Sequence, residues 1–417
     1  MKAKSTKILV IVAFVLLVVV GAVFALGRYG KIGASMLADR PPTKTALVSL
    51  GNHEWYEGEY SKSDNIGRYG YLDVISRGFF SDVSILEKHG LVRANDGYVY
   101  AFGKANNSAT LNGKKANTIT RPYKISNMKV GLIAAGADHS LITNENNTKI
   151  YSWGGNGVGQ LGNGVNRDSA NIIGVKNLTN IKYIAAGHYV SYAVTHDGVY
   201  AWGDNKSGQL GQGTLKGSSN TPLKVKLPSK AFVSVDTSGT SQIALGTDGT
   251  VYTWGPENPM PAEVQGLPRA KGVAASASGA YLALDKDDQV WVWGNTSAFS
   301  SSTEFGKDSY KEPVKLMGGS NIKLIDAGSS SITLVDRNNR VLTTGRNEYG
   351  NVGPYQIYDS VLRTSAYNVL RTPTPVFIAN DCNNGCMGRQ RYSQITDVKA
   401  ISTGNMGSLI LGAVGHM

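Results

Sequence analysis

The segments DGVYAWG at residues 197–203 and DGTVYTWG at residues 248–255 decide the fold of this chain. In each, an Asp-Gly pair is followed by alternating apolar residues that end at a Trp-Gly pair. Asp-Gly between two alternating stretches predicts a tight hairpin turn. Stretches of this kind end at glycines spaced by 39 to 52 residues: Gly51, Gly103, Gly154, Gly203, Gly255, Gly294 and Gly345. A repeat of this length is typical of solenoids and propellers.

The repeated unit reads as four short antiparallel strands. IKYIAAG at residues 181–187 predicts an inner strand that ends at a corner of small residues, and SYAVT at residues 191–195 predicts the second strand. The Trp-Gly strand comes third. A loop rich in Asn and Gly follows, and then a strand often opened by proline, as in TPLKV at residues 221–225. Four such strands make one propeller blade.

The two ends of the chain predict how the ring closes. A last unit starts with VKAISTG at residues 398–404, but the chain stops at Met417 before its later strands. TALVSLGN at residues 45–52 resembles a third strand that has no partner preceding it. We expect this N-terminal strand to complete the last blade, because closure removes two free sheet edges. The sequence therefore predicts an all-β, seven-bladed propeller of four-stranded blades over residues 44–417.

Two long motifs add a family resemblance. WGGNGVGQLG at residues 153–162 and WGDNKSGQLG at residues 202–211 are copies of one pattern, and AGADHS stands at residues 135–140. On these residues the chain resembles the regulator-of-chromosome-condensation repeat family, with weaker copies at residues 103–107 and 345–353. The resemblance implies a seven-bladed propeller. It also implies relatives that exchange guanine nucleotides on a small GTPase in the nucleus, and secreted bacterial relatives that inhibit β-lactamases.

The N-terminus is a different kind of sequence. An uncharged apolar run of 19 residues, from residue 8 to residue 26, lies between basic residues on both sides. About 20 apolar residues span a bilayer, whereas a signal peptide has an apolar region of about 7–15 residues. We expect residues 1–27 to be a signal-anchor or a cleaved signal peptide, and residues 28–43 to be a stalk. The propeller would then face the extracytoplasmic side of a membrane, or be secreted or periplasmic after cleavage.

The net charge of +12 divides between this segment and the rest of the chain. Seven basic residues and one acidic residue up to Lys44 account for half of it. The remaining half is mild for so long a body, and no run of Lys and Arg interleaved with aromatic residues occurs. We therefore expect no nucleic acid partner.

Cys382 and Cys386 are the only cysteines. They lie in a stretch, residues 379–394, that is inserted where a regular unit passes directly to the next blade. The Asn-Asn-Gly between them can turn tightly enough for the two Cβ atoms to meet, and a disulfide is expected outside the cytoplasm. A metal site would need further ligands, and no nearby histidine supplies one. Free thiols are the remaining alternative.

The search for catalytic motifs finds no Gly-x-Ser-x-Gly elbow, phosphate-binding loop or His-Glu-x-x-His pattern. The polar cluster HEWYEGEY at residues 53–60 favours an exposed loop over a metal site. His139 and His188 are expected at corresponding places in two blades, each in a structural hydrogen bond. Tryptophans at one register are expected to pack between blades: Trp153, Trp202, Trp254 and Trp293. No cofactor or metal is expected.

Function is therefore expected on irregular loops at the rim. Aromatic and arginine side chains are enriched among interface anchors, and the candidates are Trp55, Tyr56, Tyr60, Tyr69, Tyr71, Tyr355, Tyr358, Arg389, Arg391 and Tyr392. We expect a non-enzymatic propeller, either membrane-anchored or secreted, that binds an extracytoplasmic protein partner. One form of this hypothesis places the two proteins within an envelope complex. The alternatives are a carbohydrate or cell-envelope binder, a secreted enzyme inhibitor, a subunit of a surface appendage or secretion assembly, and a hydrolase or lyase with its site at the central channel.

Overall fold

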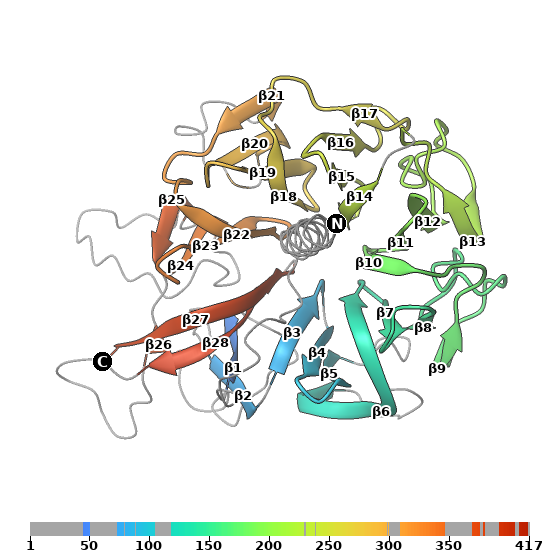
Figure 1. The fold of residues 1–417 in the computed structure, drawn as a ribbon, viewed down its shortest axis with the longest axis horizontal. Helices are drawn as coiled ribbons and strands as arrows, with labels where there is room; N and C mark the ends of the chain where they lie inside the picture. Colours follow the sequence, from blue (N-terminus) through green and yellow to red (C-terminus); the bar gives the residue numbers. More distant parts are fainter. Residues whose placement is uncertain are drawn as a thin grey trace, which may run out of the picture.

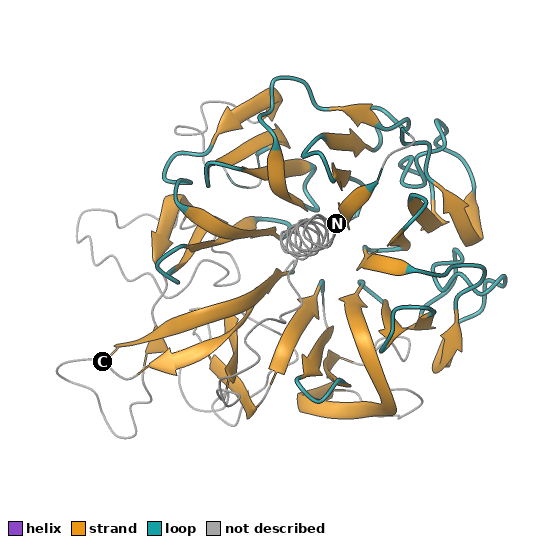
Figure 2. Cartoon of the chain, in the orientation of Figure 1, coloured by secondary structure: helices purple, strands orange, loops and turns teal. Residues whose placement is uncertain are grey.

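The computed structural model describes residues 45–50, 73–78, 80–87, 89–104, 118–228, 231–237, 239–297, 299, 309–346, 369–375, 378–379, 392–404 and 408–415. Every regular element in these ranges is a β-strand (Figure 2). The strands form sheets that are arranged as a ring around a common centre (Figure 1). This arrangement is that of a propeller, as the repeat predicts.

Four separate sheets of four strands form blades 3 to 6. Blade 3 consists of β10 (Ile181–Ala186), β11 (Val190–Thr195), β12 (Val199–Asp204) and β13 (Ser218–Lys224). Blade 4 consists of β14 (Phe232–Thr237), β15 (Gln242–Gly246), β16 (Val251–Trp254) and β17 (Ala262–Glu263). Blade 5 consists of β18 (Ala270–Ala275), β19 (Ala280–Asp285), β20 (Val290–Asn295) and β21 (Ser309–Lys315). Blade 6 consists of β22 (Ile322–Ala327), β23 (Ser331–Asp336), β24 (Val341–Arg346) and β25 (Val369–Pro375).

Blades 1 and 2 share one long strand, β6 (Thr118–Ala135). Its first part pairs with β5 and its last part with β7, so the two blades form a continuous sheet of seven strands. Blade 1 begins with β3 (Phe80–Ile85), β4 (His89–Ala94) and β5 (Tyr98–Lys104). Blade 2 continues with β7 (His139–Asn144), β8 (Ile150–Gly154) and β9 (Ser169–Gly174).

Blade 7 is built from both ends of the described chain. Its order is β27 (Tyr392–Thr403), β28 (Ser408–Gly415), β1 (Thr45–Leu50) and β2 (Asp73–Gly78), with the short β26 (Ile378–Ala379) on the other side of β27. Val48 of β1 pairs with Ile410 of β28, so the predicted closure by the N-terminal strand is confirmed. Grouped in this way, the described strands make seven units of four, in agreement with the predicted number. The predicted signal-anchor and stalk, residues 1–43, lie outside the described residues.

The position of a strand within its blade explains its composition. Second strands such as β11 and β23 are buried along their whole length, because neighbouring blades cover both of their faces. Fourth strands such as β13 lie at the outer edge and contain only exposed and half-buried residues. The tryptophans pack between blades as expected. Trp202 of blade 3 is buried in one cluster with Ala134 and Leu141 of blade 2.

Polar joints link the inner strands of successive blades. At four joints, a side chain near the end of one inner strand accepts a hydrogen bond from a backbone N–H of the next. The pairs are Ser84 with Ala135 at 2.9 Å, Asp236 with Ala275 at 3.0 Å, Asp326 with Thr403 at 2.8 Å, and Ser402 with Ile85 at 3.0 Å. The last pair joins blade 7 to blade 1, where the ring closes. There the Ser402 hydroxyl also donates to the carbonyl oxygen of Ile85 at 3.3 Å.

We expect Ser402→Ala to lower the free energy of unfolding by about 1–3 kcal/mol, because it leaves buried backbone groups of Ile85 without a partner. Chemical denaturation of the purified protein measures the change. The control is Ser218→Ala on the exposed edge of β13, which should shift the free energy by no more than about 0.5 kcal/mol. An equal effect of the two substitutions would contradict the joint.

Candidate interaction surface

The antiparallel order of the strands gives the ring two faces. In blade 3, Ala186 at the end of β10 pairs with Ser191, and Val190 pairs with Gly203 near the end of β12. The turns from first to second strands and the connections from third to fourth strands therefore lie on one face, which we call the loop face. The turns from second to third strands, such as residues 196–198, lie on the opposite face, which we call the hairpin face.

The structure describes few of the residues proposed from sequence. Trp55, Tyr56, Tyr60, Tyr69, Tyr71, Tyr355, Tyr358, Arg389, Arg391, Cys382 and Cys386 all lie outside the described residues. The third strands β1 and β24 end on the loop face, at Leu50 and Arg346. The backbone of Tyr392, the one candidate in a described strand, pairs with that of Ala379 at the hairpin-face end of β27. Of these candidates the structure describes only the backbone of Tyr392, and the others stay predictions.

Two loops of the loop face are held in shape by a buried asparagine. Asn156 is inaccessible to solvent, and its side-chain amide donates to the carbonyl oxygens of Val165 at 2.8 Å and Arg167 at 3.0 Å. Its Oδ1 accepts from the N–H of Leu161 at 2.9 Å. Asn205 makes the same set of bonds in blade 3, to Thr214 at 3.2 Å, Lys216 at 2.9 Å and Leu210 at 3.0 Å. The connections 155–168 and 204–217 are therefore one loop built twice.

Sequence reasoning missed this role of the asparagines. The signal was present, because Asn156 and Asn205 stand at the same place in the two long motif copies. A polar residue that recurs in register while its neighbours change indicates a fixed backbone bond. What the sequence could not supply was the acceptor, which lies nine to eleven residues further along the chain.

Each of these loops also contacts the next blade. The N–H of Gly164 donates to the carbonyl oxygen of Asn220 at 2.8 Å, and the N–H of Gly213 donates to that of Pro259 at 3.1 Å. Gly159 and Gly208 have φ angles of +87° and +72°, and a Cβ on either would lie 2.5 Å from Asn220 or 2.6 Å from Pro259. Only glycine permits so close an approach. The loops of blades 2, 3 and 4 therefore form a connected rim.

Exposed apolar side chains gather on this rim. Four of the seven large hydrophobic residues that are exposed in the described part of the chain lie there: Val165 at 52%, Tyr189 at 50%, Leu215 at 45% and Met260 at 40%. Met260 lies over Gly213 of the neighbouring loop. The carbonyl oxygen of Tyr189 accepts from the N–H of Asp204, where the blade 3 loop begins. We call these four residues the apolar ledge.

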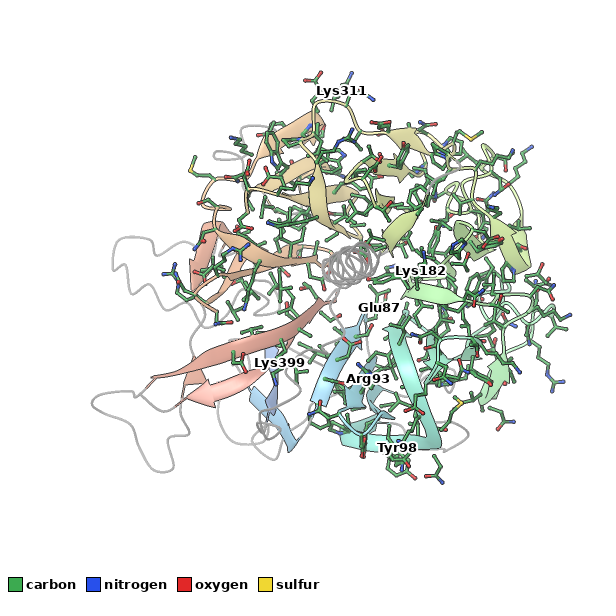
Figure 3. All side chains as sticks on the ribbon, in the orientation of Figure 1. Glu87, Arg93, Tyr98, Lys182, Lys311 and Lys399 are labelled. Atoms are coloured by element: carbon green, nitrogen blue, oxygen red, sulfur yellow. The ribbon has the colours of Figure 1, made fainter. Side chains whose placement is uncertain are left out.

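An ion pair lies nearer the centre of the loop face. Nε2 of His188 is 2.7 Å from Oε1 of Glu87, and each side chain is a little over one quarter exposed. Figure 3 shows Glu87 close to the centre of the ring, whereas Tyr98 and Lys311 lie at its outer edge. The expected correspondence of His188 with His139 was wrong. His139 pairs with Gly154, but the residue that pairs with the equivalent Gly203 is Val190.

His139 does make the expected structural hydrogen bond, within a group that resembles a catalytic triad. Its Nε2 lies 2.8 Å from Oγ of Ser191, and its Nδ1 lies 3.5 Å from Oδ1 of Asp138. The Ser191 hydroxyl, however, donates to the carbonyl oxygen of Gln160 at 2.8 Å. A serine has a single proton to donate, so His139 must donate to Ser191 instead of activating it. Ser191 and His139 are also inaccessible to solvent.

The carbonyl oxygen of Gln160 also accepts a hydrogen bond from a tryptophan. Nε1 of Trp202 donates to Gln160 O at 2.9 Å, and Nε1 of Trp254 donates to the equivalent Gln209 O at 2.8 Å. The motif Gly-Gln-Leu-Gly therefore presents a carbonyl group to the tryptophan of the next blade. Trp291, outside this register, donates to Oδ2 of Asp285 at 2.8 Å. These tryptophans serve the joints between strands and blades.

Burial controls the titration of the polar groups at these joints. Burial and, to a lesser extent, the neighbouring His139 lower the pKa of His89 to about 4, against the raising effects of Asp138 and Glu87. Burial alone would raise the pKa of Asp138, but the proximity of His139 and the amide of Gln160 hold it below its ordinary value. His89 is therefore neutral at physiological pH, with its Nε2 2.9 Å from Oγ of Ser140.

Within the described ranges, no group of three or more His, Cys, Asp or Glu side chains could hold a metal ion. The part of the chain that the structure describes also contains no helix long and apolar enough to cross a membrane.

We expect stability to fall as the pH drops from 6.5 to 4, because the unfolded chain then takes up a proton on His89 that the folded chain does not. The loss amounts to about 3 kcal/mol across this range. Urea unfolding at several pH values measures it. His89→Gln should flatten the slope, and the difference between the two proteins at pH 8 gives the cost of the substitution itself. Parallel slopes for the two proteins would be incompatible with a buried neutral His89.

Comparison with known proteins agrees with this geometry. Residues 148–194 and 196–245 match the "Regulator of chromosome condensation (RCC1) repeat" model, and residues 132–160 match a second model of that description. Human E3 ubiquitin-protein ligase HERC2 is 31% identical over 249 residues, which cover 54% of this chain but 5% of HERC2. RUG3, a mitochondrial RCC1 domain-containing protein of Arabidopsis thaliana, is 27% identical over 61% of this chain and 62% of its own length. The chain thus spans less than two thirds of these relatives.

Solved structures share the fold. Prp20p of Saccharomyces cerevisiae superposes with a TM-score of 0.71 at 18% identity, over 94% of each chain. Human WBSCR16 superposes with a TM-score of 0.68 at 16% identity, over 88% of this chain and 98% of that one. Residues 132–245 therefore match the RCC1 repeat, and the ring of described strands has the RCC1-like propeller fold.

Proposed function

We propose that this chain is a non-enzymatic propeller that binds a protein partner through its loop face. The observation that carries the proposal is the connected rim of blades 2 to 4, whose loops are fixed by Asn156 and Asn205 and bonded to one another. A rim that is rigid before binding loses little conformational entropy on association. Apolar side chains held out on such a rim favour contact with another protein.

The relatives support a binding role. Prp20p, which has the same fold, has binding properties towards Gsp1p and histones, and yeast RCC1 is found bound to Kap60. Likeness at such low sequence identity shows the fold alone. The partner of this chain therefore has to be inferred from the surface of the chain itself.

The centre of the ring argues against catalysis. The hollow there is lined by ends of inner strands, among them Asp82, Asp236 and Asp326. These carboxylates are nearly buried, and Asp236 and Asp326 accept backbone N–H groups of the next blade. His139 and Ser191 are closed to solvent, and the hydrogen bond that Ser191 donates to Gln160 opposes its activation as a nucleophile. The polar groups that resemble chemistry therefore support structure.

Attachment to a membrane is the second part of the proposal. The apolar run of residues 8–26 suffices in length to span a bilayer, and a Cys382–Cys386 disulfide fits an extracytoplasmic body. The propeller would then meet an extracytoplasmic partner, either anchored beside it or released after cleavage.

Site-directed photo-crosslinking in native cells tests the binding role. Full-length protein carries benzoylphenylalanine at loop-face positions Tyr189, Thr240 or Asn295, or at the exposed hairpin-face positions His196 or Thr247. We expect a discrete protein adduct from at least one loop-face position and none from the hairpin face. Products from the hairpin face alone would place the partner on the opposite face and contradict the proposal. The absence of protein adducts at every position would refute protein binding and favour a glycan ligand.

A further inference from the structure

We infer that the apolar ledge, residues Val165, Tyr189, Leu215 and Met260, is a docking surface for an acidic protein segment that carries apolar anchor residues. This inference rests on the proposed loop-face binding and names the chemistry of the partner. The ledge occupies three successive blades, and the other exposed large hydrophobic residues described lie elsewhere, on outer strands or on the hairpin face: Tyr123, Leu223 and Met317.

The apolar part of the ledge is suited to anchors. Val165 and Leu215 extend from loops whose backbone is fixed by buried asparagines, so these two side chains cannot withdraw into the core. Each of these side chains is about half exposed, so burial of the remainder contributes about 1 kcal/mol. A rigid backbone with apolar tips can therefore bind two or three side chains of a partner segment at spaced positions along the rim.

The charges around the ledge determine whether an acidic or a basic partner segment is favoured. Arg167, Lys206 and Lys216 are exposed, and in the described part of the chain their charged groups have no hydrogen-bond or ion-pair partner. The carboxylates of Asp168 and Asp204 bond back to their own loops, to the N–H of Asn156 at 2.7 Å and to the amide of Gln209 at 3.4 Å. Among the described residues, the three cations are thus without a partner, whereas each of these two carboxylates already accepts a hydrogen bond from its own loop.

Complementarity then favours an acidic segment. Two lysines and an arginine beside apolar tips attract carboxylates at the rim of an interface while the tips bury apolar anchors at its centre. Glu257 is the one exposed carboxylate of the blade 4 connection, so the positive potential is strongest over blades 2 and 3. A basic segment would instead face three unpaired cations there.

The test identifies the crosslinked segment itself. Full-length protein with benzoylphenylalanine in place of Leu215 or Met260 is crosslinked in native cells, and the attached partner peptide is sequenced by mass spectrometry. We expect a peptide with a net negative charge and at least one large apolar residue. A neutral or basic peptide would overturn the inference.

Matched variants separate the apolar and the electrostatic contributions to binding. Their effect is measured as the yield of the adduct formed with benzoylphenylalanine at Tyr189. Leu215→Ser with Met260→Ser should reduce the adduct about tenfold, as should Lys206→Glu with Lys216→Glu, because each pair removes apolar burial or charge attraction. Lys206→Arg with Lys216→Arg should retain it. The hairpin-face controls are Met317→Ser, which alters the most exposed apolar side chain described, and Lys182→Glu, and both should leave the yield unchanged.

The identified peptide, made synthetically, should bind the purified full-length protein more weakly as salt rises, since the charges are exposed. The inference would be overturned if neither the salt concentration nor the Lys206→Glu, Lys216→Glu pair changed the affinity of the peptide. The two proposals fail separately. Adducts at Thr240 or Asn295 with none at Leu215 or Met260 would retain loop-face binding and reject the ledge.

Discussion

The antiparallel pairing of β1 with β28 is the constraint on which the rest of the structure depends. Each blade buries its faces only against its neighbours, so a ring open at one point would expose two blade faces and a row of unpaired backbone groups. The residues that close it are far apart in sequence, Val48 against Ile410. Around this joint the apolar core passes from Leu409 and Leu411 of blade 7 to Phe80 and Val92 of blade 1. The hydrogen bond from Ile85 to Ser402 adds a polar link at the same joint.

The other joints show that packing alone does not fix the blades. An inner-strand side chain accepts a backbone N–H where the sequence offers serine or aspartate, as at Ser84 and Asp236, while Ala134 and Ala185 stand at the same place in blades 2 and 3. In blades 2 and 3 the hydrogen bonds to the next blade lie further from the centre of the ring. The carbonyl oxygen of Gln160 binds both Ser191 and Trp202, and Gln209 repeats the bond to Trp254. Repeats that look alike in sequence thus use different bonds for one geometric purpose.

This variation also explains what sequence could predict. The Asp-Gly turns, the Trp-Gly strands and the closing strand are local patterns, and each of them gave the element and its order correctly. His188 shows the limit, because a shift of two residues relative to His139 is invisible until strand register is known, and that shift takes it from a buried joint to the pair with Glu87. Val165 and Leu215 were not chosen as candidates, since an exposed aliphatic residue has no signature of its own in sequence. The chosen aromatic and arginine candidates lie mostly outside the described residues.

The two copies of the loop motif show how a repeat can hold a fixed scaffold and a variable surface. Asn156 binds the carbonyl oxygens of residues 165 and 167, and Asn205 binds those of residues 214 and 216, so residues 166 and 215 occupy the same tip position. One is asparagine and the other is leucine. Asn166 bonds to Asn220 and strengthens the contact with blade 3, whereas Leu215 is left exposed. The buried asparagines and the glycines cannot change without loss of the loop, but the tips can. Under the proposed binding role, specificity on this face would reside in the tips, while stability resides in the asparagines and glycines beneath them.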